Sequence, residues 1–354
     1  MALLVRDDVP LAPLTTLELG GRARHLVEAT DDATFIDAVR WADARGVPVF
    51  VLGGGSNVVV GDAGFDGLVI RVATRGFQFD DGGAGETLVT AAAGEPWDAL
   101  VAETVARGLA GLECLSGIPG LAGATPIQNV GAYGQEVAET IRGVRVFDRH
   151  SAALETLAPD ACAFAYRDSA FRRAPERWLV LGVTFALRTD GAPTLRYREL
   201  ADALAGTATL AQTRDTVIAL RRRKSMVLDA SDPNRRSVGS FFTNPIVDAA
   251  VADALASRAV AEGLVSRPDD VPRWPAGPGH TKLSAGWLIE RAGISKGLRR
   301  GPVGVSSAHA LALVHHGGGT TAALISLARE VRAAVQSRFG ITLTPEPIFV
   351  GITI

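Results

Sequence analysis

The residues of this chain that could do chemistry gather in short polar segments set among apolar ones. Tyr166-Arg167-Asp168-Ser169 is one, Gly239-Ser240-Phe241-Phe242-Thr243-Asn244-Pro245 is another, and Glu346 lies between two prolines just before an apolar run. The planar fork of an arginine can hold a carboxylate, and a serine or a carboxylic acid can move a proton when its neighbours stabilise the charge. Each also has a simpler interpretation, since Arg167 could pair with Asp168, and Ser240 and Glu346 could be turn residues.

Two glycine-rich segments favour a large flat ligand held by backbone. Leu52-Gly53-Gly54-Gly55-Ser56-Asn57 follows an apolar strand-like run. It is neither a Rossmann fingerprint, because Val58 stands at the third glycine position, nor a Walker A loop, because no Gly-Lys-Ser/Thr ends it. A nest of backbone N–H groups there could bind a pyrophosphate, and a tight turn is the alternative.

The second glycine-rich segment spans residues 114–135, which carry no charge and include Ser116–Gly120 and Pro126–Gly134. A long neutral segment inside a compact domain is usually functional, and glycine lets backbone N–H groups approach a ligand closely. A plain connector is the alternative. Two such segments together favour a dinucleotide cofactor held by backbone rather than by charge.

Other polar residues carry weaker signals. His309, His315 and His316 cluster without a nearby acidic or cysteine ligand, so no metal site is expected. The run Arg221–Lys224 at a helix end could be a solvated face, a complement to the helix dipole or an anion clamp. The two cysteines cannot make a zinc site alone and indicate a reducing compartment.

Composition limits the function classes. The 354 residues include 36 Lys and Arg against 38 Asp and Glu, a net charge of -2, which gives no basic footprint for nucleic acid. No run of about 20 apolar residues predicts a membrane span, and the first residues do not resemble a signal peptide. We therefore expect a cytoplasmic protein of two or three domains, with no nucleic-acid or membrane partner.

Periodicity and turn signals predict an α+β chain. Helices are expected over 31–45, 97–108, 213–224, 248–262, 281–292 and 321–338, and strands over 47–52, 58–60, 68–72, 87–93, 143–148, 178–188, 341–343 and 347–354. Residues 229–237 read as a hinge and 268–279 as a loop.

In order along the chain, these motifs resemble those of the UDP-N-acetylenolpyruvoylglucosamine reductases (MurB family). The matching set is Thr15-Thr16 with Gly20-Gly21, the Leu52–Asn57 loop, Ser116–Gly120, Pro126–Gly134, Tyr166–Ser169, Gly239–Pro245, Lys282-Leu-Ser-Ala-Gly-Trp-Leu-Ile and Pro345-Glu346-Pro347. The resemblance implies a two-lobed FAD-binding domain of the vanillyl-alcohol-oxidase (PCMH) type and a C-terminal α+β substrate-binding domain. Their expected bounds are 1–74 and 75–228 for the FAD lobes, 229–340 for the substrate domain, and 341–354 for a C-terminal segment that carries Glu346 back to the active site.

The resemblance implies a reaction in two halves. NADPH gives hydride to noncovalent FAD, and hydride then passes to C3 of UDP-N-acetylglucosamine enolpyruvate to give UDP-N-acetylmuramate. By the same resemblance Ser240 is the proton donor to C2, Arg167 binds the enolpyruvyl carboxylate, and Glu346 assists the enolate, with a raised pKa if it is protonated. A monomer is expected.

The remaining site residues also come from the resemblance. The cofactor contacts it implies are Leu52, Gly53, Gly54, Gly55, Ser56, Asn57, Ser116, Gly117, Ile118, Pro119, Gly123, Ala124, Thr125, Ile127, Gly131, Ala132 and Tyr133. The substrate contacts are Tyr197, Lys224, Asn244, Trp274, Lys296 and His309, with Tyr197 closing over the substrate, Lys296 on the diphosphate and Trp274 over the uracil. Ala124 and Thr243 depart from residues found in relatives, which removes a hydroxyl and a lysine.

Two rival interpretations share the fold. One is a flavin oxidase that uses oxygen, and the other is a flavin-binding protein without catalysis. The three residues Ser240, Arg167 and Glu346 argue against both, since all three catalytic positions carry the required chemistry.

Overall fold

The computed structural model of the protein describes residues 3–206 and 208–354. The chain forms two compact units. Unit 1 consists of the chain up to Pro10, Arg22–Ser56 and Phe65–Leu228, and unit 2 consists of Leu11–Gly21, Asn57–Gly64 and Asp229–Ile354. Two short segments within the stretch expected to form the first FAD lobe thus fold with the C-terminal part of the chain. The lobe boundary expected at 74 and 75 stays a prediction.

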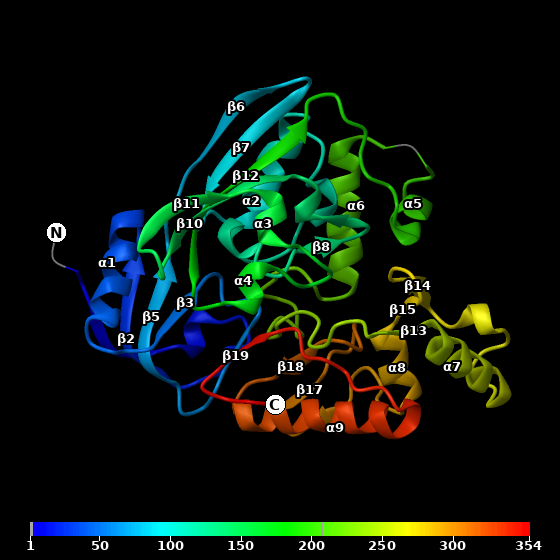
Figure 1. Cartoon of the computed structure of the whole chain (residues 1–354). Helices are drawn as coiled ribbons and strands as arrows, with labels where there is room; N and C mark the ends of the chain where they lie inside the picture. The colour runs from blue at the N-terminus through cyan, green and yellow to red at the C-terminus, as the bar shows by residue number, and fades with distance from the viewer. Residues whose placement is uncertain (1–2, 207) are drawn as a thin grey trace. The chain divides into compact units, whose positions relative to one another are not determined.

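The first sheet of unit 1 is four-stranded, in the order β1 (Arg6–Pro10), β2 (Arg22–Ala29), β5 (Phe65–Val72) and β3 (Val49–Leu52). Helix α1 (Asp32–Asp43) packs beside β2 and β5, and Figure 1 shows it alongside these strands. Its buried residues include Phe35, Ile36 and Val39, which recur at helical spacing, and the Asp31 carboxylate accepts the Thr34 N–H at 2.7 Å as an N-cap. The helix expected over 31–45 is confirmed.

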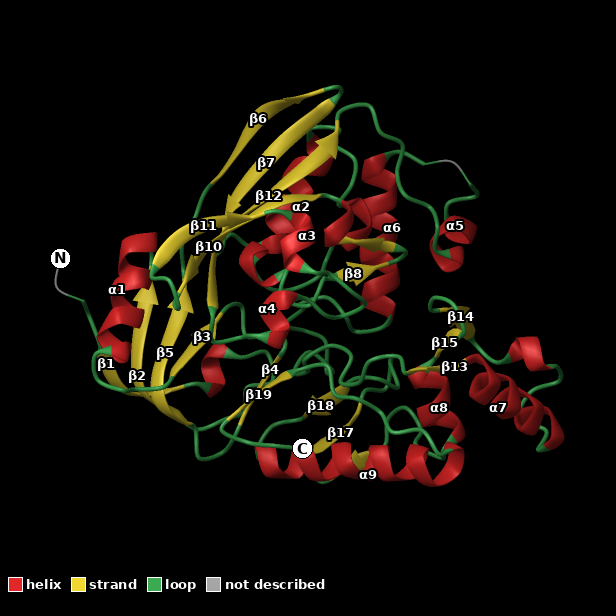
Figure 2. Ribbon diagram, in the orientation of Figure 1, coloured by secondary structure: helices red, strands yellow, loops and turns green. Residues whose placement is uncertain are grey.

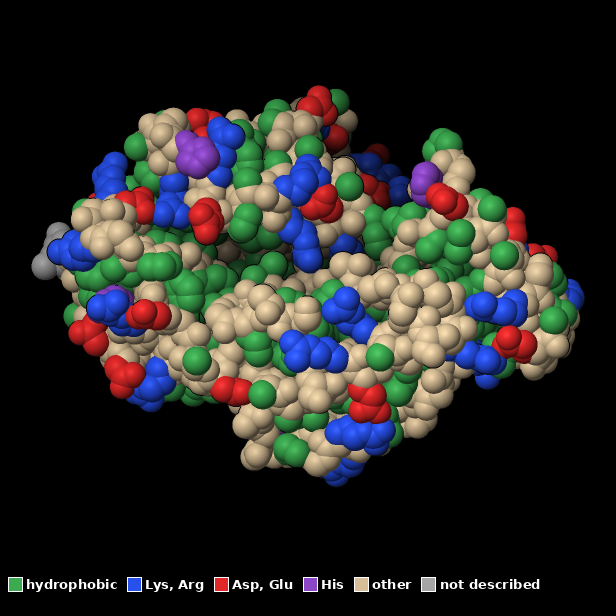
Figure 3. Space-filling view, turned by 60° about the horizontal axis from the view of Figure 1, so that its bottom comes forward, with side chains coloured by type: hydrophobic (Ala, Val, Ile, Leu, Met, Phe, Trp, Pro, Cys, Tyr) green, Lys and Arg blue, Asp and Glu red, His purple; other side chains and the backbone are tan. Residues whose placement is uncertain are grey.

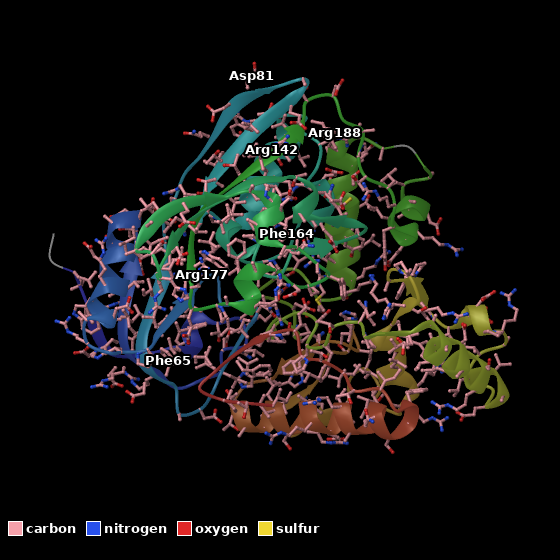
Figure 4. The ribbon with its side chains drawn as sticks, in the orientation of Figure 1. Phe65, Asp81, Arg142, Phe164, Arg177 and Arg188 are labelled. Atoms are coloured by element: carbon pink, nitrogen blue, oxygen red, sulfur yellow. The ribbon has the colours of Figure 1, made fainter. Side chains whose placement is uncertain are left out.

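The second sheet of unit 1 is five-stranded and antiparallel. Its order is β11 (Ala153–Leu157), β10 (Ile141–Asp148), β12 (Trp178–Arg188), β7 (Glu86–Ala92) and β6 (Phe77–Gly83), and Figure 2 shows the long strands. The central strand β12 is mostly buried, whereas edge strand β6 is mostly exposed. Charged side chains such as Asp81 on β6 and Arg142 on β10 lie at the surface (Figure 4). Helix α2 (Trp97–Ala106) buries Trp97 against Phe185 of β12, with ring centroids 5.7 Å apart.

Unit 1 is completed by helices and short strands. These are α3 (Pro159–Cys162), α4 (Ala170–Arg173), α5 (Arg198–Ala203), α6 (Leu210–Arg223), β8 (Gly131–Ala132) and β9 (Gln135–Glu136), together with 3-10 turns at Glu113–Leu115, Ala122–Ala124 and Val137–Glu139. Helix α6 begins three residues before the expected 213 because Thr209 and Gln212 form a capping box. Both cysteines are buried and free.

Unit 2 combines small sheets with helices that pack on one hydrophobic core. Its small sheets are β4 (Val58–Val60) with β19 (Ile348–Val350), β13 (Ile246–Asp248) with β15 (His280–Leu283) and β14 (Arg273–Pro275), and β16 (Arg299–Arg300) with β17 (Val303–Val305) and β18 (Leu313–His315). Its helices are α7 (Ala249–Ala261), α8 (Ala285–Arg291) and α9 (Thr321–Phe339), with 3-10 turns at Ala12–Leu14 and Pro268–Asp270. Helix α9 lies against β17 and β18, as Figure 1 shows.

Several expected elements differ in unit 2. The helix expected over 281–292 is split, because residues 281–283 belong to β15 and Ser284 caps a shorter helix that begins at Ala285. Residues 341–343 are not a strand, and the strand expected over 347–354 is reduced to Ile348–Val350. Residues 273–275, expected in a loop, form β14 because they pair with β15. Of the two apolar runs expected as strands near the end of the chain, one is therefore shorter than expected and the other is not a strand.

The surface carries charged side chains of both signs. On the face drawn in Figure 3, basic and acidic side chains lie interspersed, in keeping with the net charge of -2. Within residues 3–206 and 208–354, no helix has the length and apolar character that crossing a membrane requires. Over the same residues, no group of three or more His, Cys, Asp or Glu side chains is arranged to hold a metal ion.

Candidate active site

The two glycine-rich segments of unit 1 lie directly against each other. A Cβ added to Gly54 would lie 2.8 Å from Gly120 Cα, so only glycine lets the two backbones come this close. The Ser56 hydroxyl donates to Pro119 O at 3.3 Å across the same contact. The two loops therefore form one structural feature, in which Gly53 is half-buried and Gly54 is exposed.

The N–H groups of this feature divide into used and unused ones. Within the described residues, the N–H groups of Gly53 and Gly54 donate no hydrogen bond, whereas that of Gly117 donates to Asp98 at 2.6 Å and that of Gly123 to Ala93 O at 2.9 Å. The glycine loop after β3 thus offers donors to a ligand, while the second segment is tied into unit 1.

Three hydroxyl-bearing or acidic residues fix the shape of the second segment. Ser116 Oγ donates to Glu113 O and Thr125 Oγ1 to Ala122 O, both at 2.7 Å. Asp98 also receives two hydrogen bonds from Arg214. Burial alone would raise the pKa of Asp98, but the hydrogen bonds from Arg214 and Gly117 outweigh it and hold the pKa below its usual range.

Arg221 on α6 lies beside the same segment and has an unused donor. Its Cδ and Nε lie 3.5 Å from where a Gly117 Cβ would be, and its Nη2 donates to Met226 O at 2.7 Å. Among the described residues, its buried Nε has no hydrogen-bond partner. Burial lowers the pKa of Arg221 to about 10, so the guanidinium is still charged at neutral pH. A buried cation with an orphaned donor favours an anionic or electron-rich ligand group at this place.

Arg167 is held in place by the loop that follows the second glycine segment. Its Nη2 donates to Gly131 O at 2.7 Å, and its backbone adopts φ +54°, a left-handed conformation that is costly for a residue with a Cβ. Ser169 Oγ donates to Ile127 O at 2.5 Å. Phe164, just before this segment, packs partly buried on the core of unit 1 (Figure 4). The strained backbone is thus fixed from both sides and aims the Arg167 side chain.

Asn129 is the link between these two loops. Its side chain is buried, Nδ2 donates to Glu136 at 2.7 Å and to Ala165 O at 3.1 Å, and Oδ1 accepts the Ala138 N–H at 3.1 Å. It also has φ +45°. Asn129 therefore positions the segment that carries Arg167.

Tyr133, Tyr197 and Lys224 come together in unit 1 although they are far apart in sequence. The rings of Tyr133 and Tyr197 meet edge to face with centroids 5.4 Å apart, and Lys224 Nζ lies 5.8 Å from the Tyr133 centroid. Lys224 Nζ also donates to Glu199 at 2.6 Å. Burial raises the pKa of Tyr133 to about 12 and raises that of Tyr197. Both phenols are therefore neutral hydrogen-bond donors at neutral pH.

Ser240 and Glu346 belong to paired segments of unit 2. The Glu346 N–H donates to Phe241 O at 3.0 Å, and the Thr243 N–H donates to Thr344 O at 3.0 Å. Ser240 follows Gly239, whose φ of +73° makes the turn, and both Ser240 and Glu346 are half-buried. Two residues that are 106 positions apart are thus carried by neighbouring segments, which are joined by these hydrogen bonds and by an isolated β-bridge between Phe242 and Pro345.

The other substrate residues expected in unit 2 differ in how they are connected to the segments of Ser240 and Glu346. Asn244 Oδ1 accepts the N–H of Ala285 at 2.9 Å and so fixes the start of α8. His309 belongs to a turn whose neighbour Leu311 accepts the Phe241 N–H at 2.8 Å. Trp274 is exposed on β14 opposite Lys282. Lys296 Nζ lies 3.7 Å from Glu290 Oε1.

The structure divides the predicted site residues between the units. Unit 1 carries Leu52 to Ser56, all expected cofactor residues from Ser116 to Tyr133, and Arg167, Tyr197 and Lys224; unit 2 carries Asn57, Ser240, Asn244, Trp274, Lys296, His309 and Glu346.

Comparison with known proteins decides the family. The C-terminal domain of UDP-N-acetylenolpyruvoylglucosamine reductase matches residues 232–350, and an FAD binding domain matches residues 23–156. The chain is 50% identical to the UDP-N-acetylenolpyruvoylglucosamine reductase of Streptomyces coelicolor over 98% of this chain and 90% of that protein. It is 53% identical to that of Saccharopolyspora erythraea, over 96% and 94%. The chain belongs to the UDP-N-acetylenolpyruvoylglucosamine reductase family.

A solved structure agrees with this assignment. The crystal structure of the reductase (MurB) from Thermus caldophilus superimposes with a TM-score of 0.68 at 25% identity and covers 98% of this chain and 99% of that one. The α+β fold with an FAD-binding domain, expected from the sequence, is therefore confirmed, and the chain is an FAD-containing oxidoreductase of the MurB family.

FAD fits the residues of unit 1. The free N–H groups of Gly53 and Gly54, the close approach of Gly54 to Gly120 and the orphaned Nε of Arg221 together supply donors and room for an anionic dinucleotide. Sequence reasoning left the run Arg221–Lys224 open as a solvated face, a complement to the helix dipole or an anion clamp. It missed Asn129 and Glu199, for which the only signals were an Asn beside Val-Gly and an acid two residues after Tyr197.

Proposed function

We propose that this protein reduces UDP-N-acetylglucosamine enolpyruvate to UDP-N-acetylmuramate for peptidoglycan precursor synthesis, with NADPH as the hydride donor, in the cytoplasm. The observation that carries the proposal is the pairing of the Ser240 and Glu346 segments, which gives one unit a hydroxyl and a carboxyl on adjacent hydrogen-bonded segments. The names of the relatives, which act on this substrate, support it.

FAD is held in this proposal by backbone and by one cation. The N–H groups of Gly53 and Gly54 would bind its pyrophosphate, the segment from Ser116 to Tyr133 would line it, and Arg221 Nε would donate to an electron-rich atom of it. When bound, FAD supplies hydride transfer, from NADPH and then to C3 of the enolpyruvyl group. Because this lining is uncharged, the charges of the site belong to a few residues at fixed positions.

Arg167 binds the carboxylate of the enolpyruvyl group. Its bonds to the carbonyl oxygens of Gly131 and Asn129 use part of the guanidinium and fix the plane of the fork. Holding the carboxylate through charge-assisted hydrogen bonds orients the double bond and withdraws electrons from it. A lysine at the same place could supply charge but not the planar geometry.

Ser240 donates the proton that completes the product at C2. A serine hydroxyl is a weak acid, so it acts only where the receiving carbon develops carbanion character and where neighbours stabilise the charge. Glu346, carried by the paired segment, assists the enolate through a hydrogen bond. Gly239 keeps Ser240 at the turn, since its left-handed φ suits glycine.

The remaining polar residues bind the UDP-sugar. Lys224 and Lys296 supply cations for anionic groups of the substrate, Asn244 and His309 supply polar contacts, and Tyr197 and Trp274 supply aromatic faces. Trp274 is 40% exposed and Tyr197 is 37% exposed, so part of each side chain is accessible to a substrate.

Ser240→Ala tests the proposal, with each half of the reaction followed separately under anaerobic conditions. We expect NADPH to bleach the flavin absorbance at the wild-type rate, and the return of the absorbance on adding the enolpyruvyl substrate to be slower by about 10²- to 10⁴-fold. Ser231→Ala is the matched control, because that hydroxyl is bonded to Asp229 within its own exposed turn. Normal turnover by Ser240→Ala would refute the proton-donor role, and rapid oxidation of NADPH by oxygen without substrate would favour an oxidase.

A further inference from the structure

We propose that the Glu199 carboxylate pairs with Lys224 until an anionic group of the substrate displaces it. This competition for Lys224 weakens substrate binding. The inference rests on the proposed function, in which Lys224 contacts the UDP-sugar. Glu199 itself touches neither substrate nor FAD in this account. Glu199 is a specificity-determining residue because a ligand must carry enough negative charge to replace its carboxylate at Lys224.

The contact is short but open to solvent. Lys224 Nζ and Glu199 Oε2 are 2.6 Å apart, and their side chains are 34% and 38% exposed. Ion pairs with this exposure contribute little net stability, because water solvates both charges well. An anionic ligand can therefore replace the Glu199 carboxylate at small cost.

The surroundings of Lys224 fit a site for an anionic ligand. Its ammonium lies over the Tyr133 ring, which meets the Tyr197 ring edge to face. Burial first, and then the Glu199 charge, raise the pKa of Tyr197. The carboxylate therefore places negative charge beside a tyrosine assigned to the substrate, as well as beside the lysine.

The chain around Glu199 is held independently of the Lys224 pair. Arg196 pairs with Glu139 at 2.9 Å, and a Cβ on Gly134 would lie 3.1 Å from Arg196 Cβ, so this segment packs against the Tyr133-Gly134 turn. Leu200 of α5 is fully buried. Loss of the Glu199 charge should thus leave Tyr197 in place and change mainly the electrostatics of Lys224.

The sign of the effect separates this role from a structural one. If Glu199 competes with substrate, Glu199→Gln should bind the anionic substrate more tightly. If the pair only braces the segment, the same change should bind substrate more weakly. We expect the KM of the enolpyruvyl substrate to fall about two- to fivefold with kcat unchanged, in line with the small net value of such pairs.

Four variants complete the test. Glu199→Asp keeps the charge and should retain the wild-type KM, whereas Lys224→Met should raise KM, and adding Glu199→Gln to Lys224→Met should have no further effect. Asp202→Asn is the matched control, because it breaks the exposed Arg198 pair on the same helix without touching Lys224. Its KM should equal that of the wild type.

The outcomes distinguish the two proposals. A KM for Glu199→Gln that stays the same or rises, while Lys224→Met raises KM, would overturn the inference and leave the role of Lys224 intact. A Lys224→Met variant with the wild-type KM would overturn both. A fall in KM for Glu199→Gln that persists in the Lys224→Met background would show that the carboxylate acts elsewhere and would also overturn the inference.

Discussion

Replacing Asn129 tests how the structure positions Arg167. The Asn129 side chain makes three hydrogen bonds, to Glu136, to the Ala165 carbonyl and from the Ala138 N–H. These bonds join the loop after the second glycine segment to the segment that carries Arg167. Asn129→Ala removes all three and leaves the half-buried Glu136 and Ala138 without these bonds, whereas the Ala165 carbonyl keeps the hydrogen bond from the Asp168 N–H.

The expected magnitude follows from the bonds and from the backbone. Each lost hydrogen bond costs about 1 kcal/mol of the free energy of unfolding, so the three together cost about 3 kcal/mol. Asn129 has φ +45°, a conformation that asparagine tolerates better than alanine, which adds about 1 kcal/mol for the alanine variant. Asn129→Gly loses the same three bonds without the backbone cost. The two variants should therefore differ by about 1 kcal/mol.

Urea unfolding of both variants measures these values, and steady-state kinetics measure the effect on Arg167. We expect the KM of the enolpyruvyl substrate to rise in both variants, because the carbonyl oxygens of Asn129 and Gly131 that hold Arg167 lie in the loosened loop. Bleaching of the flavin by NADPH serves as the control for an intact cofactor site. An Asn129→Ala variant as stable as the wild type, with an unchanged KM, would refute the reasoning.

Three further predictions concern other parts of unit 1. Gly54→Ala should lower the affinity for FAD about tenfold or more, measured by flavin fluorescence, because its Cβ would overlap the backbone of the second glycine segment. Gly53→Ala has room for its Cβ and should leave the stability of the apoprotein unchanged. Arg167→Lys should raise the KM of the enolpyruvyl substrate about ten- to hundredfold through loss of the planar fork. Arg173→Lys, at an exposed arginine of the following helix α4, should leave this KM unchanged. The pKa of Asp98 is lowered in the folded protein, so its contribution to stability is complete above the pKa of the unfolded state, about 3.9, and is lost as the pH falls through the folded value. In Asp98→Asn, the free energy of unfolding measured with urea should therefore fall less as the pH is lowered. A pH profile equal to that of the wild type would contradict the assignment.

The sequence predicted those elements whose stabilising contacts are made by residues close together along the chain. The helix at α1 has an N-cap at Asp31 and apolar residues at helical spacing, and both features were readable. The exposed edge strands β1 and β6 were missed, because their residues are polar and their order comes from pairing with a neighbouring strand. The split before α8 was missed for the same reason, since β15 depends on pairing with β14 and with the more distant β13.

The residues of the candidate site were readable as motifs, but their geometry was not. The motifs around Ser240 and Glu346 could be quoted from the sequence, whereas the hydrogen bond from Glu346 to Phe241 depends on the folded chain. The left-handed backbone of Arg167 also has no sequence signal, because arginine at positive φ is uncommon. The orphaned donor of Arg221 is visible only when burial is known.

An anaerobic visible spectrum, titrated first with NADPH and then with UDP-N-acetylglucosamine enolpyruvate, tests the central claim most directly. The account predicts that the flavin band of the purified protein bleaches with NADPH and returns in full on addition of the enolpyruvyl compound, with one equivalent of UDP-N-acetylmuramate formed. A band that bleaches and does not return would contradict the proposed substrate. The lack of any flavin band after adding FAD would contradict the assignment of both glycine-rich segments.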